Sequence, residues 1–274
     1  MKLLEVIELR HVYPGGVVAL EGVNVAIEEG EKVAVVGQNG SGKTTLCRHF
    51  NGLLRPTSGK VLLKGVDTAG KTIGELSRTA GYVFQNPSHQ LFCSTVWEEV
   101  QFGAKNIGLR GEELNTRVKD TLEFFGLARI GKKHPLSFSS GVRKLVALAS
   151  VYAMRPRLLV LDEPTTGQDH WGREQVGHAV TKMAGDGCAC VVVTHDMNFV
   201  ATYTDRVVVM TEGKVIKEGS PREVFSDWES MKRAFIAPPQ VSKLAHMLAG
   251  KGVSQRVLTP EELAEELVEK DVIS

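Results

Sequence analysis

The residues best suited to chemistry begin with a glycine-rich stretch that matches the spacing G-x-x-x-x-G-K-S/T: Gly37, Gln38, Asn39, Gly40, Ser41, Gly42, Lys43, Thr44 and Thr45. Glycines let a backbone curl around an anion, so that successive N–H groups and the positive end of a following helix point at phosphate oxygens. The Lys43 ammonium then contacts the β- and γ-phosphates, and the Thr44 hydroxyl is a ligand for Mg²⁺. A Gly/Ser-rich turn with an incidental Lys-Thr pair is the alternative. Because a strand-like run precedes the stretch, we predict that it binds a nucleoside triphosphate.

A pair of acids supplies the carboxylates that such a phosphate cradle lacks. Asp162 and Glu163 follow the apolar run Leu158–Leu161 and precede Pro164. At the carboxyl end of a buried strand, Asp162 is placed to hold Mg²⁺ or its water shell. Glu163 would then face a water and orient or deprotonate it for in-line attack on the γ-phosphate. A solvated acid pair in a turn is the alternative, and the apolar run before it argues against that interpretation.

Three further side chains are candidates on weaker grounds. His195 ends another strand-like run, where an imidazole can hydrogen-bond the γ-phosphate, although a lone histidine is more often structural. Gln85 also ends such a run and is a candidate for contact with the metal or the attacking water, but glutamine at a strand end is commonly a cap. Tyr13 offers a flat π-surface for stacking on adenine, with an ordinary strand-edge aromatic as the alternative.

These side chains can form one site only if the strands before them end at the same edge of a sheet. The run 32–36 before the cradle is apolar and β-branched, and residues 45–50 after it are able to open a helix. Similar short apolar runs occupy 81–85, 158–161 and 191–194, and a hairpin is expected over 206–217. Residues 86–155 show mainly helical spacing. Strands alternating with helices around a phosphate cradle predict an α/β fold with an open sheet and ligands at the strand ends.

Composition restricts the class of protein. The chain has 274 residues and a formal net charge of +1, so no overall basic field points to nucleic acid as the main partner. The longest apolar stretches, such as 146–154, fall short of the ~18 residues that a membrane span needs. An acid at position 5 argues against a secretory signal peptide. The four cysteines have no C-x-x-C spacing and indicate free thiols in a reducing cytosol. We expect a soluble intracellular protein.

From about residue 3 to residue 219 these motifs together resemble an ATP-binding cassette (ABC) ATPase. In that comparison the stretch 37–45 is similar to the Walker A motif, 158–162 to Walker B and 166–169 to the D-loop; Tyr13, Gln85, Glu163 and His195 are similar to the adenine-stacking aromatic, the Q-loop glutamine, the catalytic acid and the switch histidine. The resemblance implies a P-loop NTPase with a RecA-like core and a helical subdomain at about 86–155. It also implies that two chains sandwich two ATP molecules.

In this family each ATP site is completed by a signature loop from the other subunit, usually Leu-Ser-Gly-Gly-Gln. Counting back from Walker B by the family's usual interval aligns the signature serine with Ser139, and the loop reads FSSGV over 138–142. Ser139 and Gly141 keep the phosphate-contacting positions. Ser140 replaces the first glycine and narrows the approach to the γ-phosphate, and Val142 replaces the glutamine. The resemblance therefore suggests an asymmetric pair in which this chain donates a weakened signature to a different ATPase.

A narrower resemblance is to the ATPase subunits of energy-coupling factor (ECF) transporters, which take up vitamins or cobalt and nickel ions. It is carried by 85–92 and 95–103, which are similar to an extended Q-loop segment in which His89 replaces a common acidic residue. It is also carried by the tail from about 220, especially 238–245, which is similar to a C-terminal helical domain that pairs ATPase subunits. The implied division is an ATPase domain at 1–219 and a helical appendage at 220–274.

The ECF resemblance also implies partners and a location. The expected partners are a second ATPase subunit (a paralogue, or else a copy of this chain), a transmembrane coupling subunit docked near 85–103 and a substrate-binding membrane subunit. Nucleic acid is not among them. The chain would lie at the cytoplasmic face of the cell membrane as a peripheral subunit, with ATP and Mg²⁺ as cofactors. The alternatives are a conventional ABC importer ATPase, a poorly hydrolysing regulatory cassette, and a soluble ABC protein that acts on DNA or ribosomes.

Two patterns in the tail allow local predictions. Val241, Leu244, Ala245 and Leu248 share one helical face, which favours contact with a partner subunit, while a helix folded on its own cassette fits the periodicity equally well. In the last helix, Thr259 is expected to be the N-cap, Pro260 the first helical residue, and Glu262 the second member of a capping box. Leu263 and Leu267 should then lie on one face.

Overall fold

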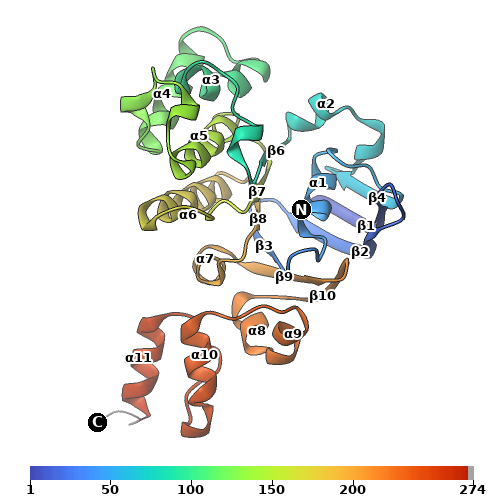
Figure 1. The fold of residues 1–274 in the computed structure, drawn as a ribbon, viewed down its shortest axis with the longest axis vertical. Helices are drawn as coiled ribbons and strands as arrows, with labels where there is room; N and C mark the ends of the chain where they lie inside the picture. Colours follow the sequence, from blue (N-terminus) through green and yellow to red (C-terminus); the bar gives the residue numbers. More distant parts are fainter. Residues whose placement is uncertain (271–274) are drawn as a thin grey trace.

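The computed structural model describes residues 1–270 and contains two sheets with helices packed around them (Figure 1). The four-stranded sheet is antiparallel in the order β2-β1-β4-β5; its strands are β1 (Lys2–Val12), β2 (Val18–Glu28), β4 (Ser58–Leu63) and β5 (Val66–Asp67). The six-stranded sheet has the order β10-β9-β3-β8-β7-β6; its strands are β3 (Lys32–Val36), β6 (Ala80–Val83), β7 (Leu158–Asp162), β8 (Ala189–Val193), β9 (Arg206–Thr211) and β10 (Lys214–Gly219). Its strands β9, β3, β8, β7 and β6 are parallel. The α/β prediction is confirmed.

The helices connect and cover these strands. They are α1 (Lys43–Phe50), α2 (Ile73–Ser77), α3 (Val96–Asn106), α4 (Gly111–Phe124), α5 (Ser140–Tyr152), α6 (His170–Gly185), α7 (Met197–Tyr203), α8 (Pro221–Ser226), α9 (Trp228–Arg233), α10 (Gln240–Met247) and α11 (Pro260–Glu269). Single 3₁₀ turns occupy Thr68–Gly70, Pro87–His89, Ala128–Ile130, Pro135–Ser137 and Ala249–Lys251. In Figure 1, α3–α5 lie at one end of the molecule and α10 and α11 at the other. Within residues 1–270, no helix combines the length and the apolar character that crossing a bilayer requires.

The register of the parallel strands brings the predicted site residues to one edge. Val35 of β3 pairs with Val193 of β8, and Val193 in turn pairs with Asp162 of β7. On the other side of β7, Leu161 pairs with Val83 of β6. Since all of these strands run in the same direction, the turns that follow them emerge side by side. The phosphate cradle, the acid pair and the turn containing His195 therefore share one end of the sheet.

Alternating side chains of the central strand β7 pack against the helical segment (α3, α4 and α5) on one face of the sheet and against α1 on the other. Leu159 and Leu161 of β7 belong to an apolar cluster that includes α3, α4, α5 and α6. Leu158 and Val160 belong to a second cluster, which joins the sheet to α1 and to the antiparallel sheet. Successive side chains of a strand point to opposite faces, so β7 is buried on both sides and is continuously apolar. The Asp162 end of this strand is thereby fixed from both faces.

The C-terminal helices divide into two groups by their packing. Helices α8 and α9 pack on the six-stranded sheet, where Val224 and Phe225 share a cluster with Val207 and Val209. Helices α10 and α11 have a small cluster of their own: Ala245, Val253, Val257 and Leu263, with Val241, Leu248 and Leu267 against it. Leu263 and Leu267 do share a face, as predicted.

The partner-facing interpretation of α10 requires correction. Three of the four residues assigned to its apolar face, Val241, Ala245 and Leu248, pack inside the small C-terminal cluster. Leu244 is the member that stays accessible, with 44% of its surface exposed. The face is apolar because the chain's own α11 covers it, and an amphipathic pattern alone does not say what covers a helix.

The capping of α11 is also only half as predicted. Thr259 is the N-cap and accepts a hydrogen bond from the Glu262 N–H, and Pro260 is the first helical residue. The Glu262 carboxylate, however, accepts from the Leu258 N–H at 2.8 Å and ion-pairs with Arg222 of α8. The hydrogen bond from Arg222 lowers the pKa of Glu262. This carboxylate therefore joins α11 to α8 where a complete capping box was expected.

Candidate functional site

The phosphate cradle runs from the end of β3 into α1, and its lysine is buried beneath it. The Lys43 Nζ donates to the carbonyl oxygens of Gly37 at 2.7 Å and Gln38 at 2.8 Å. Burial lowers the pKa of Lys43, and the nearby charges of Glu163 and Asp162 oppose that shift. The loop therefore wraps around the ammonium, which is held next to the acid pair. The ammonium is therefore already desolvated before an anion binds in the cradle.

Gly42 shows why the cradle needs glycine. Its φ of 100° lies in the left-handed region that side chains disfavour. A Cβ at this position would also lie 2.7 Å from the carbonyl oxygen of Ala19. The turn into α1 can therefore be made only by a residue without a side chain.

Thr44 and Asp162 come together as predicted, with a third residue that sequence reasoning missed. The Thr44 hydroxyl donates to Asp162 Oδ1 at 3.2 Å, and the Tyr82 hydroxyl donates to Asp162 Oδ2 at 2.9 Å. Tyr82 and Asp162 are 6% and 2% exposed. Burial raises the pKa of the Tyr82 phenol above its usual range. The available signal was a tyrosine in a buried strand, whose hydroxyl needs a partner.

Glu163 follows β7 in a strained conformation and points at His195. Its φ is 50°, and its N–H donates to the Val193 carbonyl at 2.8 Å. Glu163 Oε2 accepts from the Thr166 hydroxyl at 3.1 Å. His195 Nε2 lies 3.2 Å from Oε1 but outside hydrogen-bond geometry, so among residues 1–270 this buried oxygen has no donor. A buried carboxylate oxygen without a donor is a position that a water can fill.

Tyr13 lies beside the helix that follows the cradle. It comes directly after β1 and is half-buried, and its hydroxyl is 3.1 Å from the Thr45 hydroxyl. The ring of His11 packs edge-on against it at 4.7 Å between centroids, and His11 in turn contacts His49 of α1. These contacts hold Tyr13 against α1.

The Gln85 side chain does not hydrogen-bond to Thr44, Asp162 or Glu163. It lies two residues beyond β6 and is exposed, and no hydrogen bond from its side chain is found within the described part of the chain. Gln90 makes the local contacts instead, accepting from the Phe84 N–H at 3.2 Å and donating to the Ala147 carbonyl at 3.0 Å. The contact of Gln85 with the metal or the attacking water stays a prediction.

The loop aligned with the signature begins α5. Ser139 is the N-cap residue, but its exposed hydroxyl makes no capping hydrogen bond. The Gly141 carbonyl accepts from Gln168 Nε2 at 3.1 Å, which links this loop to the turn after Glu163. Within residues 1–270, neither Ser139 nor Gly141 makes a hydrogen bond to the chain's own phosphate cradle.

Comparison with known proteins settles the family. The ABC transporter family matches residues 20–166. This chain belongs to that family. The energy-coupling factor transporter ATP-binding protein EcfA of Methanococcus maripaludis is 42% identical over 250 residues, covering 90% of each protein. That of Methanocaldococcus jannaschii is 42% identical over 253 residues, covering 92% of this chain and 91% of the relative. The chain is an ECF-type ABC ATPase, and ATP hydrolysis is the activity of its family.

Solved structures agree with this assignment. The structure of cbiO1 from Clostridium perfringens, described as part of the ABC transporter complex cbiONQ, is similar with a TM-score of 0.76 at 38% identity, covering 89% of this chain and 99% of that one. The cassette MJ0796, in a post-hydrolysis dimer bound to ADP and Pi, is similar with a TM-score of 0.74 at 29% identity, covering 80% and 98%. The predicted fold class and family are confirmed.

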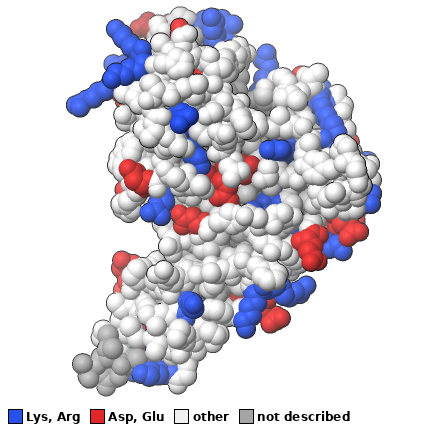
Figure 2. Space-filling view, in the orientation of Figure 1, with Lys and Arg blue, Asp and Glu red and all other residues white. Residues whose placement is uncertain are grey.

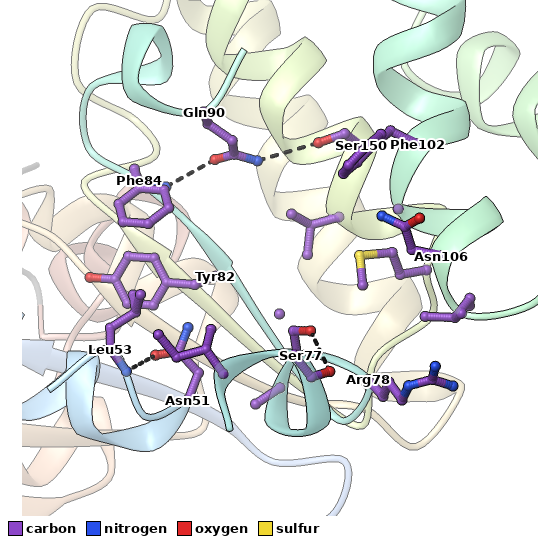
Figure 3. Close-up of a pocket in the computed structure, with 18 of the residues that line it drawn as sticks. Asn51, Leu53, Ser77, Arg78, Tyr82, Phe84, Gln90, Phe102, Asn106 and Ser150 are labelled. Carbon is purple, nitrogen blue, oxygen red and sulfur yellow. Dashed lines mark hydrogen bonds between the residues drawn. The ribbon is translucent and has the colours of Figure 1, made fainter. Parts of the chain in front are cut away.

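The ABC ATPase also has a cavity between β6 and the helices α2, α3 and α5. Its volume is about 570 Å³. In Figure 3, Tyr82, Phe84 and Phe102 line it with aromatic rings, and Gln90 contacts Ser150 at its edge. Phe92 and Phe102 form an edge-to-face pair, with ring centroids 4.8 Å apart, and are exposed. An exposed aromatic cleft of this kind marks a surface that another protein can cover.

Proposed function

We propose that this ATPase powers the uptake of a vitamin or a transition-metal ion, with the residues described above as its catalytic site. The observation that carries the proposal is the position of Glu163. Its carboxylate extends from the end of β7, next to Asp162, and one of its oxygens is buried without a hydrogen-bond donor among residues 1–270. The Lys43 ammonium and the backbone N–H groups of Gly40–Thr45 would hold the ATP phosphates. Tyr13 would stack on the adenine. Gln85 would reach the metal or the attacking water only after its loop moves.

The oxygen donors at the end of the sheet suit Mg²⁺. Thr44 and Asp162 offer a hydroxyl and a carboxylate 3.2 Å apart, and Mg²⁺ prefers such oxygen ligands together with waters and substrate phosphates. When bound, Mg²⁺ would neutralise charge on the β- and γ-phosphates. Tyr82 would keep the Asp162 carboxylate oriented toward Thr44.

Hydrolysis would use the donor-free oxygen of Glu163. A water hydrogen-bonded there would have its lone pair directed at the γ-phosphorus, and Glu163 would accept its proton as the new O–P bond forms and the β–γ bridging bond breaks. His195, 3.2 Å from that oxygen and with a half-exposed side chain, would contact the γ-phosphate and so report its presence. Lys43 would stabilise the charge that develops on the leaving diphosphate.

The proposed partners are inferred from groups that are exposed on this chain. We propose that Ser139 and Gly141 contact the ATP of a second ECF ATPase subunit, a paralogue or else a copy, because the Ser139 hydroxyl is exposed and does not cap α5. We also propose residues 1–219 as the ATPase domain, with a helical subdomain at about 86–155. Residues 220–274, of which 271–274 lie outside the described residues, would form a C-terminal helical domain that pairs subunits, and the exposed Leu244 of α10 is available for that contact.

Two membrane proteins complete the proposed assembly. The aromatic cleft beside Phe92 and Phe102 would receive an apolar segment of a transmembrane coupling subunit, which in turn would carry a substrate-binding subunit. The ATPase would then be peripheral, at the cytoplasmic face of the membrane. Basic and acidic side chains are interspersed on the face shown in Figure 2, which favours a protein partner over nucleic acid there.

Substitution of Glu163 by Gln tests the catalytic assignment. The amide keeps the size of the side chain but cannot accept the proton, so turnover by the complex purified from native membranes should fall at least about 100-fold. ATP affinity should stay within about twofold, because Glu163 acts on the water rather than on the bound phosphates. Turnover equal to that of the wild type would remove Glu163 from its proposed role. The same purification, with a tag on this chain, should recover two membrane proteins and a second ATPase.

A regulatory cassette that hydrolyses ATP poorly is the second candidate. Ser140 and Val142 at the start of α5 favour it, since they replace the small and polar residues of the family's signature. Steady-state ATPase activity measured with and without the partner ATPase separates the two functions. A regulatory cassette would contribute no turnover when the partner's own catalytic acid is replaced.

A further inference from the structure

Lys144 is a buried cation behind the catalytic acid. It lies in the second turn of α5 and is only 6% exposed. Its Nζ donates to the backbone carbonyl of Glu163 at 2.6 Å, and no carboxylate of residues 1–270 forms an ion pair with it. Burial lowers the pKa of Lys144, and the carboxylates of Glu163 and Asp162 oppose that shift. A lysine is rarely buried without a salt-bridge partner, so this placement needs a reason beyond packing.

The backbone that Lys144 contacts is the one that aims the Glu163 carboxylate. Glu163 has a φ of 50°, a conformation that costs a non-glycine residue about 1–3 kcal/mol and persists only where its surroundings enforce it. Its N–H is held by the Val193 carbonyl and its C=O by the Lys144 ammonium. The two sides of this strained residue are therefore fixed by different elements, β8 and α5.

Helix α5 connects this contact to the signature loop. Gly141 and Lys144 are three residues apart and lie next to each other on the helix surface. The Gly141 carbonyl is held by Gln168, and the neighbouring Arg143 donates to the Ser88 hydroxyl at 3.2 Å. A displacement of the first turn of α5 thus moves the ammonium that holds the Glu163 carbonyl.

We infer that Lys144 is a positioning residue for ATP hydrolysis, which holds Glu163 in its catalytic conformation and connects it to the signature loop at the start of the same helix. The inference rests on the proposed role of Glu163. In an ATP sandwich, the signature loop of this chain contacts the partner's nucleotide while Glu163 acts on the chain's own nucleotide. Lys144 is then the physical connection by which occupancy of one site adjusts the catalytic acid of the other.

The test compares Lys144→Met with Lys144→Arg in the complex purified from native membranes. Met keeps length and removes the donor and the charge, whereas Arg keeps both. We expect Lys144→Met to lower kcat about 10- to 100-fold with KM for ATP within about twofold, because a small misplacement of a catalytic group has an effect of this size. Lys144→Arg should recover a substantial part of kcat. Lys119→Met, on the exposed face of α4, is the control and should keep full activity.

A second measurement uses the isolated full chain and separates positioning from folding. Without the ammonium, the Glu163 segment should lose protection, so its amide hydrogens should exchange about tenfold faster in Lys144→Met than in Lys119→Met. The Tm should shift by no more than about 4 °C, because replacing a buried charge by an apolar side chain is often neutral or stabilising.

Several results would overturn the inference or the function on which it rests. An unchanged kcat in Lys144→Met, when Glu163→Gln abolishes turnover, would leave the catalytic site intact and remove Lys144 from it. A lower Tm with unchanged kcat, or loss of folded protein in both Lys144 variants, would assign Lys144 a structural role only. If Glu163→Gln itself kept full turnover, the proposed function would fail first, and that outcome is measured separately.

Discussion

The substitution Tyr82→Phe removes one oxygen from the magnesium side of the site and leaves the packing unchanged. The phenol donates to Asp162 Oδ2 at 2.9 Å, and both side chains are almost fully buried. A hydrogen bond to a charged group contributes about 1.5–3 kcal/mol to stability. Phe fills the same volume, so no cavity term is added. We therefore expect the free energy of unfolding to fall by about 1.5–3 kcal/mol.

The assay is urea unfolding without nucleotide or metal, read as a shift of the midpoint at constant m-value. Tyr152→Phe is a matched control, since the Tyr152 hydroxyl makes no hydrogen bond to any described residue; it should change stability by less than about 0.5 kcal/mol. In an Asp162→Ala background the Tyr82 hydroxyl is left buried and unpaired. There, Tyr82→Phe should be neutral or stabilising, because it removes that unpaired group.

The same substitution has a functional consequence. With Oδ2 released, the Asp162 carboxylate is no longer held with Oδ1 toward Thr44. Partners that orient a metal ligand typically change metal affinity by about 10- to 100-fold. The Mg²⁺ concentration for half-maximal ATPase activity should therefore rise about tenfold, with little change in kcat at saturating Mg²⁺. A stability loss below about 0.5 kcal/mol in both backgrounds, with unchanged Mg²⁺ dependence, would refute the reasoning.

Two further predictions concern the edges of the ATPase. Tyr13→Ala should weaken ATP binding by about 1–3 kcal/mol through lost stacking, while Tyr13→Phe should stay close to wild type; equal losses in titration calorimetry would point to the hydroxyl contact with Thr45 instead. Asp227 accepts from Lys217 and caps α9, and these contacts lower its pKa to about 2. A lowered pKa in the folded state stabilises above the unfolded value near 3.9, and the effect is lost as pH falls toward 2. Asp227→Asn should therefore lower Tm at pH 7, and the difference from wild type should shrink below about pH 4 and vanish only near pH 2; a difference constant with pH would contradict it.

The parts of the site that could be predicted are those whose residues are consecutive in the sequence. The cradle 37–45 and the acid pair Asp162–Glu163 each consist of a buried strand and the turn after it, so the local pattern fixes both the element and the edge where it ends. The parallel register then brings these turns together without further information. The resemblance to a known family added the signature loop, which no local pattern identified.

The contacts that sequence analysis missed join residues far apart in the chain. Tyr82 is 80 residues from Asp162, and Lys144 is 19 residues from the Glu163 carbonyl that it holds. Both side chains occupy positions that read as ordinary core of a strand or helix. Which polar group meets which partner depends on strand register and helix rotation, and neither is encoded in a short stretch. The partner-facing interpretation of α10 needed correction for the same reason. Its apolar periodicity was correct, but periodicity does not specify which element covers the face.

The packing of Val142 bears on the altered signature. It is partly buried against the cluster of the helical segment, so this position serves the chain's own core and offers nothing polar to a partner. What α5 can present across an interface is the exposed Ser139 hydroxyl and the N–H groups of its first turn, which have no partner within the helix. A helix N-terminus binds phosphate through those N–H groups and its dipole, without a glutamine side chain. In the proposed pair of ATPases, we therefore expect this chain to donate a weaker but still attractive phosphate contact. We also expect occupancy of the partner's site to act on the Glu163 carbonyl through α5 and Lys144.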